Sequence, residues 1–381
     1  MIVVAAVSQS ATAAVIVRPL PLPAGFTVAP EGDHRLMTMG ADGTVYAVAN
    51  RIDTPYRTAA VRWRVENKAE FFVPISGPND HFGGTYAPRI DSIVPSAGAP
   101  YVTVGRTHDG AYIGTQFEVD RWLGGRATAL PLPVCLEVGY DSPHVYAIDH
   151  QWLALTLDPS SNSVGIDLSD PTSVERNLPK AFTVTPDRCR SLGNAILTGI
   201  RGDSVVGYLG YLDGKPAPWF INLIVQRMVA LRWSNGRRRR LGFGVPFATT
   251  SGGTVVGATD LPGHAQESMT GNFFGPAGTY VFRTPHAVMW SSIGKETLLF
   301  GGDSRSIAWD VDEAGTIVGM IQGADGRHHA FRCKNGRIAL LDDLPHPSGW
   351  RFESAYAVAA DGSIAGIGTY RGVATAFIWH Q

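Results

Sequence analysis

Short runs in which apolar and polar residues alternate recur along the whole chain, and Gly, Asn, Asp or Pro separates one run from the next. Val, Ile, Tyr, Phe and Thr supply most of the apolar positions, which is typical of half-buried β-strands. No segment shows a sustained helical stripe bounded by capping residues. The pattern therefore predicts an all-β chain made of many short strands.

One phrase recurs within this pattern: a glycine-centred turn and a short apolar strand, followed by Ala, two further residues and usually Trp. Its four clearest copies are Gly43-Thr-Val-Tyr-Ala with Ala60-Val-Arg-Trp63, Gly253-Thr-Val-Val-Gly with Ala287-Val-Met-Trp290, Gly315-Thr-Ile-Val-Gly with Ala330-Phe-Arg-Cys333, and Gly362-Ser-Ile-Ala-Gly with Ala376-Phe-Ile-Trp379. Repeats of this length mark an array of supersecondary units that stack to share a core. The dipeptides Asp42-Gly43 and Asp361-Gly362 further predict type I′ hairpin turns.

The spacing of the turns gives the number of units. The turn position falls at residues 43, 203, 253, 315 and 362, and the first step of 160 residues is about three times the later ones. Two degenerate copies are therefore expected inside it, before the strands that begin at Tyr101 and Trp152. Seven four-stranded antiparallel units predict a seven-bladed β-propeller.

The two ends of the chain predict how such a ring would close. Only 19 residues follow Gly362, which is too few for the fourth strand of a blade. Residues 20–26 repeat the pattern of residues 344–350, which follow the outer strand of the sixth unit, so residues 15–17 are expected to form the outer strand of the seventh. The fold predicted is thus an all-β, seven-bladed β-propeller closed by an N-terminal strand that pairs with the C-terminal blade. It forms a single domain over residues 14–381.

The repeated phrase, when followed by His-Ala-Phe, resembles the HAF-repeat family of predicted extracellular bacterial proteins. His329-Ala-Phe331 carries all three letters, whereas His286-Ala-Val288 and Thr375-Ala-Phe377 carry two each. The resemblance is clear in the last three units and weak in the first four. It implies a propeller-like repeat protein that is secreted or displayed at the surface, and it brings no catalytic residues.

Charge and composition limit the classes of binding partner that the protein can have. A net charge of −1 argues against nucleic acid or a membrane surface as a bulk electrostatic partner, and no apolar run is long enough for a membrane helix. Residues 1–13 resemble the end of a signal peptide, with an Ala11-Thr-Ala13 cleavage pattern but no basic region before it. We expect a secreted, periplasmic or cell-surface monomer; the alternative is a cytoplasmic protein in which this likeness is chance.

The three cysteines leave one without a partner. Cys135 and Cys189 are 54 residues apart, one repeat length, so they could form a disulfide between neighbouring blades. Two buried thiols are the interpretation favoured slightly, because adjacent blades need not bring the Cα atoms within about 7 Å. Cys333 occupies the Trp position of its unit and is expected to be a core residue.

Three further features of the sequence are candidates for chemistry. His286 and His329 begin equivalent strands, so a structural role in satisfying a backbone group or capping a turn is favoured over a metal pair. The segment from Asp310 begins like a calcium loop but has Ala314 and Ile321 where ligands are required, which favours a hairpin turn. No metal and no cofactor is therefore expected. Arg237–Arg240 lie on a predicted outermost strand, where protection of the edge is favoured over contact with an acidic polysaccharide or lipopolysaccharide phosphate.

Two insertions are the strongest departure from the repeat. Between its second and third strands the seventh unit has only Arg371-Gly-Val, whereas the fourth and fifth units have residues 212–227 and 261–285. Both insertions occupy the same connection of consecutive blades, so they are expected side by side on one face, where long loops concentrate function. The residues expected to bind a ligand are Trp219, Phe220, Asn222, Gln226, His264, Glu267, Asn272 and Phe273.

Aromatic faces together with amide and carboxylate groups suit the recognition of sugars or peptides. The sequence therefore predicts a binding or interaction module for a carbohydrate or cell-envelope ligand, with a protein ligand also compatible. An alternative is a carbohydrate-active lyase or hydrolase, for which His264 and Glu267 are the catalytic candidates. The other alternative is a purely structural surface repeat whose loops merely pack on each other. Binding without catalysis is favoured, because no nucleophile elbow or phosphate-binding loop is present.

Overall fold

The computed structural model describes most of the chain between residues 15 and 380. The described ranges are 15–22, 24–28, 37–40, 42–51, 58–64, 69–71, 89–94, 101–106, 116–123, 126–129, 142–149, 152–158, 178–185, 188–212, 215–216, 227–260, 285–301 and 304–380. Within these ranges the only regular element that is not a strand is one 3-10 turn, η2 (Leu341–Asp343). The prediction of an all-β chain is confirmed.

The strands of the described ranges form seven antiparallel sheets, numbered in chain order. Sheet 1 contains β2 (Phe26–Val28), β3 (Met37–Met39), β4 (Val45–Arg51), β5 (Thr58–Trp63) and β6 (Ala69–Phe71). Sheet 2 contains β7 (Arg89–Val94), β8 (Tyr101–Arg106), β9 (Gln116–Leu123) and β10 (Arg126–Ala129). Sheet 3 contains β11 (Ser142–Asp149), β12 (Trp152–Asp158), β13 (Lys180–Thr185) and β14 (Arg188–Asn194).

The second half of the chain is arranged in the same way. Sheet 4 contains β15 (Ile196–Arg201), β16 (Ser204–Leu212), β17 (Lys215–Pro216), β18 (Arg227–Ser234) and β19 (Arg237–Phe243). Sheet 5 contains β20 (Val245–Thr249), β21 (Val255–Asp260), β22 (Pro285–Trp290) and β23 (Glu296–Leu298). Sheet 6 contains β24 (Ser306–Val311), β25 (Ile317–Gln322), β26 (His328–Lys334) and β27 (Arg337–Leu340). Sheet 7 contains β28 (Trp350–Val358), β29 (Ile364–Tyr370), β30 (Val373–His380) and β1 (Ile16–Leu20).

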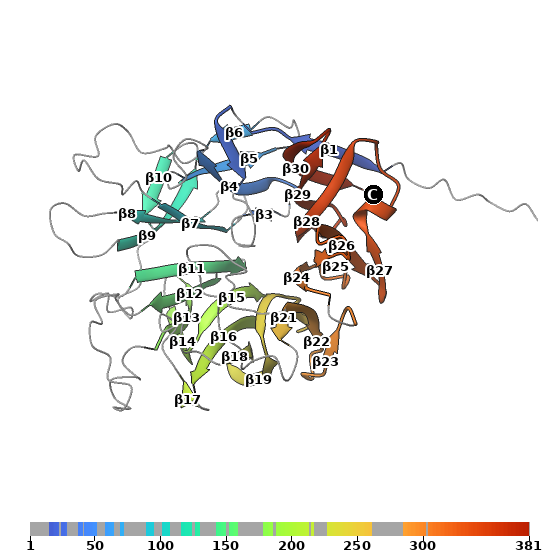
Figure 1. Cartoon of the computed structure of the whole chain (residues 1–381). Coiled ribbons are helices and arrows are strands. Elements are labelled where there is room, and N and C mark those ends of the chain that lie inside the picture. Colours follow the sequence, from blue (N-terminus) through green and yellow to red (C-terminus); the bar gives the residue numbers. More distant parts are fainter. Residues whose placement is uncertain are drawn as a thin grey trace, which may run out of the picture.

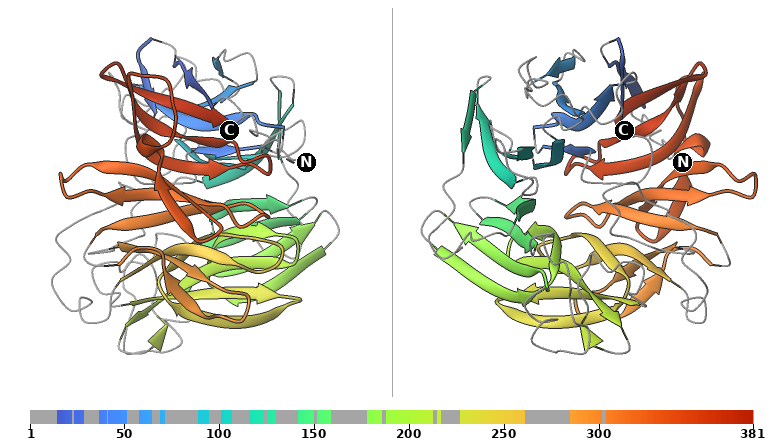
Figure 2. Two further views of the ribbon diagram at one scale, coloured as in Figure 1. Left: turned by 90° about the vertical axis from the view of Figure 1, so that its right-hand side faces the viewer. Right: turned by 60° about the vertical axis from the view of Figure 1, so that its left-hand side comes forward.

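The sheets are arranged around a common centre (Figure 1). One strand from each sheet contacts its counterpart in the next sheet, in the order β3, β7, β11, β15, β20, β24 and β28, and β28 contacts β3 again. Figure 2 shows from two further sides that each twisted sheet lies beside the next in chain order. Because neighbouring sheets face each other, each can bury an apolar face that it could not bury alone.

The N-terminal strand completes the last sheet. β1 pairs antiparallel with β30, from Ile16 opposite His380 to Leu20 opposite Ala376. Val17 and Leu20 are buried, and Val17 packs with the side chains of sheet 7. The predicted pairing between the beginning and the end of the chain is confirmed. The strands expected at Tyr101 and Trp152 also begin at those residues, as β8 and β12.

The repeated phrase acquires a physical meaning in sheet 6. Gly315 has a positive φ of 80° and closes a three-residue hairpin in which the Gly315 N–H donates to the Asp312 carbonyl at 3.0 Å. The same hydrogen bond joins Gly362 to Ala359. Only the glycine of each turn has a positive φ, so these are turns with a glycine bulge, and the type I′ prediction is wrong. Two-residue hairpins in which both residues have a positive φ occur instead at Asn235-Gly236, Asn335-Gly336 and Arg371-Gly372.

The second glycine of the phrase faces a β-bulge. In sheet 6 the register of β24 shifts between Ala308 and Asp310, opposite Gly319. A Cβ atom at Gly319 would lie 2.0 Å from the carbonyl oxygen of Ile307, so no larger residue fits there. The alanine of the phrase is fully buried, and the Trp position pairs with the first residue of the second strand, as in Trp290 opposite Val255. In the repeated phrase, the second glycine therefore makes room for the bulge, and the Ala and Trp positions supply the core.

Candidate functional site

The two long insertions begin and end at the same side of neighbouring sheets. Tyr211 of β16 pairs with Arg227 of β18, and Asp260 of β21 pairs with Pro285 of β22. β16 and β15 of sheet 4 both contact β20 of sheet 5. The bases of the insertions therefore lie on one face of two adjacent sheets, as the sequence predicts. The ligand-binding candidates lie outside the described residues: Trp219, Phe220, Asn222, Gln226, His264, Glu267, Asn272 and Phe273.

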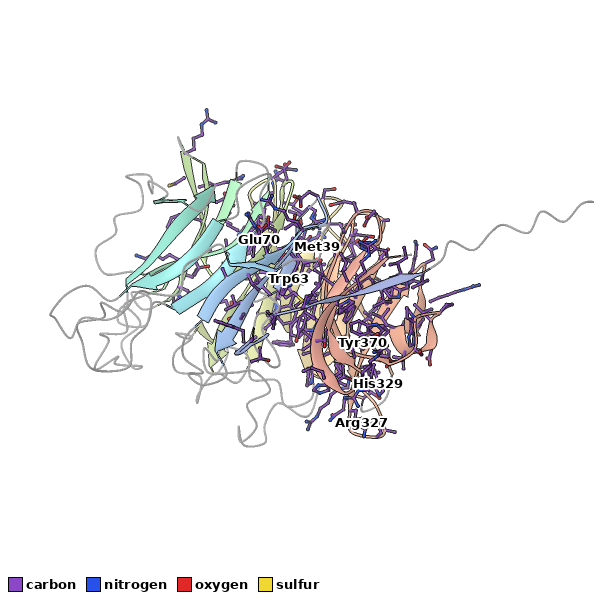
Figure 3. All side chains as sticks on the ribbon, turned by 90° about the horizontal axis from the view of Figure 1, so that it is seen from above. Met39, Trp63, Glu70, Arg327, His329 and Tyr370 are labelled. Atoms are coloured by element: carbon purple, nitrogen blue, oxygen red, sulfur yellow. The ribbon has the colours of Figure 1, made fainter. Side chains whose placement is uncertain are left out.

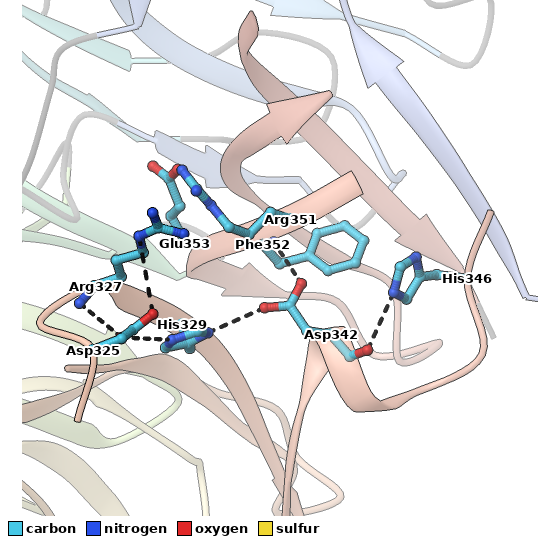
Figure 4. A network of polar contacts seen from close by, with 8 residues as sticks. All are labelled: Asp325, Arg327, His329, Asp342, His346, Arg351, Phe352 and Glu353. Carbon is cyan, nitrogen blue, oxygen red and sulfur yellow. Dashed lines mark hydrogen bonds and ion pairs between the residues drawn. The ribbon is translucent and has the colours of Figure 1, made fainter. Parts of the chain in front are cut away.

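The described part of this face contains a cluster of charged side chains on sheets 6 and 7. The second and third strands of sheet 6 are joined by the short turn of residues 323–327, which occupies the connection that is long in sheets 4 and 5. Arg327, His329 and Tyr370 lie close to one edge of these sheets in the view from above (Figure 3). The six members of the carboxylate-histidine cluster, as we name it, are Asp325, Arg327, His329, Asp342, Arg351 and Glu353 (Figure 4).

Asp342 is the fixed point of the cluster. It lies in the 3-10 turn η2, between the outer strand of sheet 6 and the first strand of sheet 7. Its Oδ1 accepts the backbone N–H of Phe352 at 2.9 Å, and its carbonyl oxygen lies 3.2 Å from Nε2 of His346. One carboxylate oxygen is thus tied to the next sheet, which leaves Oδ2 to face the third strand of sheet 6.

His329 lies between two carboxylates. Its Nδ1 is 3.2 Å from Oδ2 of Asp342, and its Nε2 is 3.4 Å from Oδ1 of Asp325 (Figure 4). A neutral imidazole carries only one N–H, so it can donate to one carboxylate at a time, whereas the imidazolium can donate to both. The side chain of His329 is 21% exposed, so a ligand can reach this proton-carrying group from solvent.

Two arginines complete the cluster. Arg351 donates from an Nη to Oε1 of Glu353 at 2.6 Å, and its Nε–H is buried without an acceptor among the described residues. Arg327 donates its backbone N–H to Oδ1 of Asp325 at 3.0 Å. This hydrogen bond, followed by the hydrogen bond and charge of His329, holds the pKa of Asp325 below its usual value. The face therefore presents carboxylate acceptors and guanidinium donors at fixed positions, which suits a ligand rich in hydroxyl groups.

The structure revises the interpretation of the two histidines. His329 contacts side-chain carboxylates rather than a backbone group, so the expectation of backbone satisfaction is wrong for this residue. His286 occupies the equivalent position of sheet 5 and is 1% exposed. Within the described ranges no three His, Cys, Asp or Glu residues lie together in a way that could hold a metal ion.

The hairpin interpretation of the segment from Asp310 is confirmed. The Asp310 carboxylate accepts the backbone N–H groups of Val311 at 2.8 Å and of Val358 at 2.9 Å, which ties sheet 6 to sheet 7. Burial raises the pKa of this carboxyl group. Asp312 accepts the N–H of Thr316 at 2.7 Å within the turn. These carboxylates therefore hold the turn and the sheet junction in place.

The cysteines differ from the favoured expectation in one respect. Cys189 is disulfide-bonded, so the interpretation as a buried thiol is wrong for it, and Cys135 lies outside the described residues. Cys333 is a free cysteine, 6% exposed, in the Trp position of sheet 6. Burial raises the pKa of its thiol. Its assignment as a core residue is confirmed.

Sequence reasoning missed the carboxylates of the cluster. Asp325 lies in a short turn, and Asp342 belongs to the segment Leu341-Asp-Asp-Leu-Pro345, whose last two residues begin the Leu-Pro pattern that predicts the closing strand. One signal was available in the sequence. His329 of the HAF phrase is preceded by Asp325 and followed by Asp342, in the turns on either side of the strands β26 and β27. Nothing in the spacing indicates that these two turns meet at one imidazole.

Comparison with solved structures shows the architecture. The β-propeller domain of the Trilobed protease from Pyrococcus furiosus has a TM-score of 0.51 at 9% identity, covering 90% of this chain and 91% of that chain. The fold is that of a β-propeller. A puromycin hydrolase mutant (TM-score 0.52, 14% identity, 89% of this chain) and the Pyrococcus horikoshii acylaminoacyl peptidase (TM-score 0.50, 12% identity, 89% of this chain) are also similar. This propeller spans 50% of the length of each of those two chains.

The comparisons by sequence add no family. No protein-family model matches the chain, and no curated protein matches it. Among the described residues there is no helix with the length and apolarity needed to cross a membrane.

Proposed function

We propose that the chain is a closed, seven-bladed β-propeller that acts outside the cytoplasm as a binding module for a carbohydrate or cell-envelope ligand. The seven sheets, the ring of contacts between their first strands and the pairing of β1 with β30 support the closed ring. The His-Ala-Phe phrases support kinship with the HAF repeats. A monomer is part of the proposal, because the ring leaves no blade without a neighbour.

One observation carries the functional part of the proposal. The bases of the two insertions lie on the side of the ring where the carboxylate-histidine cluster is also built. Sheets 4, 5 and 6 follow one another in the ring, so the bases of the insertions and the cluster lie on one continuous face. Long loops above a rigid scaffold that holds polar groups in place are the usual arrangement of a binding surface.

The chemistry of this face fits a sugar. Trp219 and Phe273 are proposed to stack on the apolar faces of sugar rings, and Asn222 and Gln226 to bond their hydroxyl groups. At the edge of the site, Asp325 offers a carboxylate acceptor, and His329 offers a donor or an acceptor according to its protonation.

Two observations support the proposal that the protein is exported from the cytoplasm. Cys189 is disulfide-bonded, and disulfides persist mainly in oxidising compartments such as the periplasm or the extracellular space. The likeness of residues 1–13 to the end of a signal peptide agrees with this. Detection of the mature protein in a periplasmic or culture fraction would test the localisation directly.

The test of binding is a glycan and cell-envelope screen with the full chain. The double variant Trp219→Ala/Phe273→Ala is expected to lose the retained ligand, with affinity falling about 100-fold, because each stacked ring contributes about 1–1.5 kcal/mol. The melting temperature should stay within about 2 °C of the wild type, because surface substitutions change stability little. Full retention of every ligand by the double variant would overturn the assignment of the site.

A second variant examines the described cluster. His329→Gln removes the imidazole that lies between two carboxylates, and we expect an affinity loss of about fivefold. His328→Gln is the matched control, since it changes the same residue type at the adjacent position of β26. Equal losses in the two variants would remove the cluster from the site. Turnover of a retained glycan, abolished by Glu267→Gln, would favour the enzymatic alternative.

A further inference from the structure

We propose that the outer edge of sheets 3 and 4 is a separate binding site for an anionic polysaccharide, held by arginines of β14 and β19. β19 is the outermost strand of sheet 4, and its first four residues, Arg237–Arg240, are all exposed. β14 is the outermost strand of sheet 3 and adds Arg188 and Arg190, both exposed. The two strands together carry six arginines and no acidic residue, on a chain whose net charge is −1. The site does not depend on the proposed function of the insertion face.

Protection of the edge does not account for four successive arginines. The outer strands of other sheets have the sequences AEF in β6, RATA in β10, ETL in β23 and RIAL in β27. Each of these four outer strands has a single charged residue, and charged side chains on an edge discourage pairing between edges. The three additional arginines of β19 require another reason.

The arginines of β19 point to both sides of the strand. Arg238 is paired with Trp233, whose indole N–H donates to the Leu192 carbonyl of sheet 3, so Arg238 lies on the side of sheet 3. Arg239 is paired with Arg232, and both donate to the Ser292 carbonyl of sheet 5, so they lie on the opposite side. A flat membrane would meet only one of these sides, whereas a flexible polymer that crosses the edge can meet both.

On the side of sheet 4 that faces sheet 5, two guanidinium groups are held close together, where they could bind an anion. Arg232 and Arg239 donate to one carbonyl oxygen, that of Ser292, at 3.0 and 3.2 Å. The Nε–H of Arg232 also donates to Ser204 at 3.1 Å, so this 8%-exposed guanidinium is fixed before any ligand arrives. Burial lowers the pKa of Arg232, and the charge of the neighbouring Arg239 lowers it further. An anion beside them would relieve that repulsion.

The side that faces sheet 3 adds a second group of cations and an aromatic ring. Arg190 lies against the turn at Gly236, where a Cβ atom would collide with its guanidinium. Arg240 stacks over Phe243 with its Cζ atom 4.8 Å from the ring centroid, and Phe243 is 39% exposed. Guanidinium groups form paired hydrogen bonds with sulfate, phosphate and carboxylate, and an exposed ring can stack on a sugar.

The disulfide selects a polysaccharide among the polyanions. Cys189 lies between Arg188 and Arg190 in β14 and is disulfide-bonded. Disulfides persist mainly in oxidising compartments, which are separated from the nucleic acids of the cytosol. The bond also fixes β14, which reduces the conformational entropy that its arginines lose when they bind.

The test measures retention of the full-length protein on immobilised dextran sulfate. The wild type is expected to bind and to be released by salt, because exposed charge pairs are screened. Arg238→Gln/Arg240→Gln and Arg237→Gln/Arg239→Gln should each weaken binding about tenfold, on the basis of two exposed charge contacts each. The matched control, Lys334→Gln/Arg337→Gln, removes two exposed cations from a hairpin of sheet 6 and should change binding less than about twofold.

Several results would overturn the proposal. They are absence of retention, an equal loss in the control variant, or a loss in only one of the two β19 variants, since the polymer is said to meet both sides. Stronger binding to phosphatidylglycerol vesicles or to duplex DNA, at equal charge concentration, would also overturn it in favour of that partner. Trp219→Ala/Phe273→Ala should bind dextran sulfate like the wild type, so failure of the edge site and failure of the insertion site are distinguishable.

Discussion

The third strands of sheets 5 and 6 have the same place in the fold and nearly the same sequence. The histidine that they share nevertheless has different surroundings in the two strands. β22 has His286-Ala-Val-Met-Trp290 and β26 has His329-Ala-Phe-Arg-Cys333. His286 is 1% exposed, whereas the side chain of His329 is 21% exposed and lies between two carboxylates. The alanines of both strands are fully buried. Equivalent positions therefore share backbone and core requirements, while the neighbouring turns decide what a polar residue does.

The largest difference between the two strands is expected at the Trp position. Trp290 is fully buried and its indole N–H donates to Glu296 at 3.1 Å, whereas sheet 6 places the smaller Cys333 there. Trp290→Ala should lower the free energy of unfolding by about 3–5 kcal/mol, and Cys333→Ala by about 1 kcal/mol, because the cavities differ in size. Urea unfolding of both variants gives the comparison. Similar losses of unfolding free energy in the two variants would contradict the expectation that the larger cavity costs more.

The glycine that faces the bulge should behave alike in both sheets. A Cβ atom would lie 2.1 Å from the Val245 carbonyl oxygen at Gly257, and 2.0 Å from that of Ile307 at Gly319. We expect Gly257→Ala and Gly319→Ala each to cost about 1–3 kcal/mol of unfolding free energy, since the bulged strand must move. Gly301→Ala is the control, because nothing lies within 4 Å of its Cβ position. A neutral result at either bulge would contradict the proposed role of the phrase.

The histidines should separate stability from binding. His286→Gln is expected to cost about 2 kcal/mol of unfolding free energy because a buried polar side chain is rearranged. His329→Gln is expected to cost less than about 0.5 kcal/mol, because the residue lies at the surface. Thermal and urea unfolding measure both. If the two variants lose equal stability, the distinction between a core histidine and a site histidine is wrong.

The smallest expected effect concerns pH and the turn of sheet 6. The N–H of Arg327 and then His329 hold the pKa of Asp325 below its usual value. A carboxyl group whose pKa is lower in the folded state stabilises the fold above its unfolded pKa, about 3.9, and loses this contribution as the pH falls through the folded value. Asp325→Asn should therefore be slightly less stable than the wild type at pH 7, and the difference should vanish near pH 2. A constant difference would assign the effect to something other than ionisation.

Periodicity and repeat spacing predicted much of this fold because they reflect the backbone directly. The phrase located the second strands even at Tyr101 and Trp152, where its letters are degenerate, and the incomplete last unit indicated that the first strand must close it. The turn type was wrong because Asp-Gly suits both a type I′ turn and a glycine bulge, and only the length of the connection separates them.

The site was less predictable because it depends on contacts between sheets. His329 meets Asp342 only because the 3-10 turn after β27 bends back toward β26, and no period in the sequence encodes this contact. Cys189 illustrates the same limit, since its oxidation state depends on its distance from another cysteine, which spacing does not supply. The insertion residues, from Trp219 to Phe273, stay predictions.

The pairing of β1 with β30 has a consequence for how the protein is made. The five residues of β1 find their partners at residues 376–380, so β1 is synthesised long before the strand with which it pairs. Contacts between such distant segments slow folding and leave the nascent edge open to unwanted pairing. The pairing can form only after β30 has been synthesised, and until then the edge of β1 is open to a chaperone.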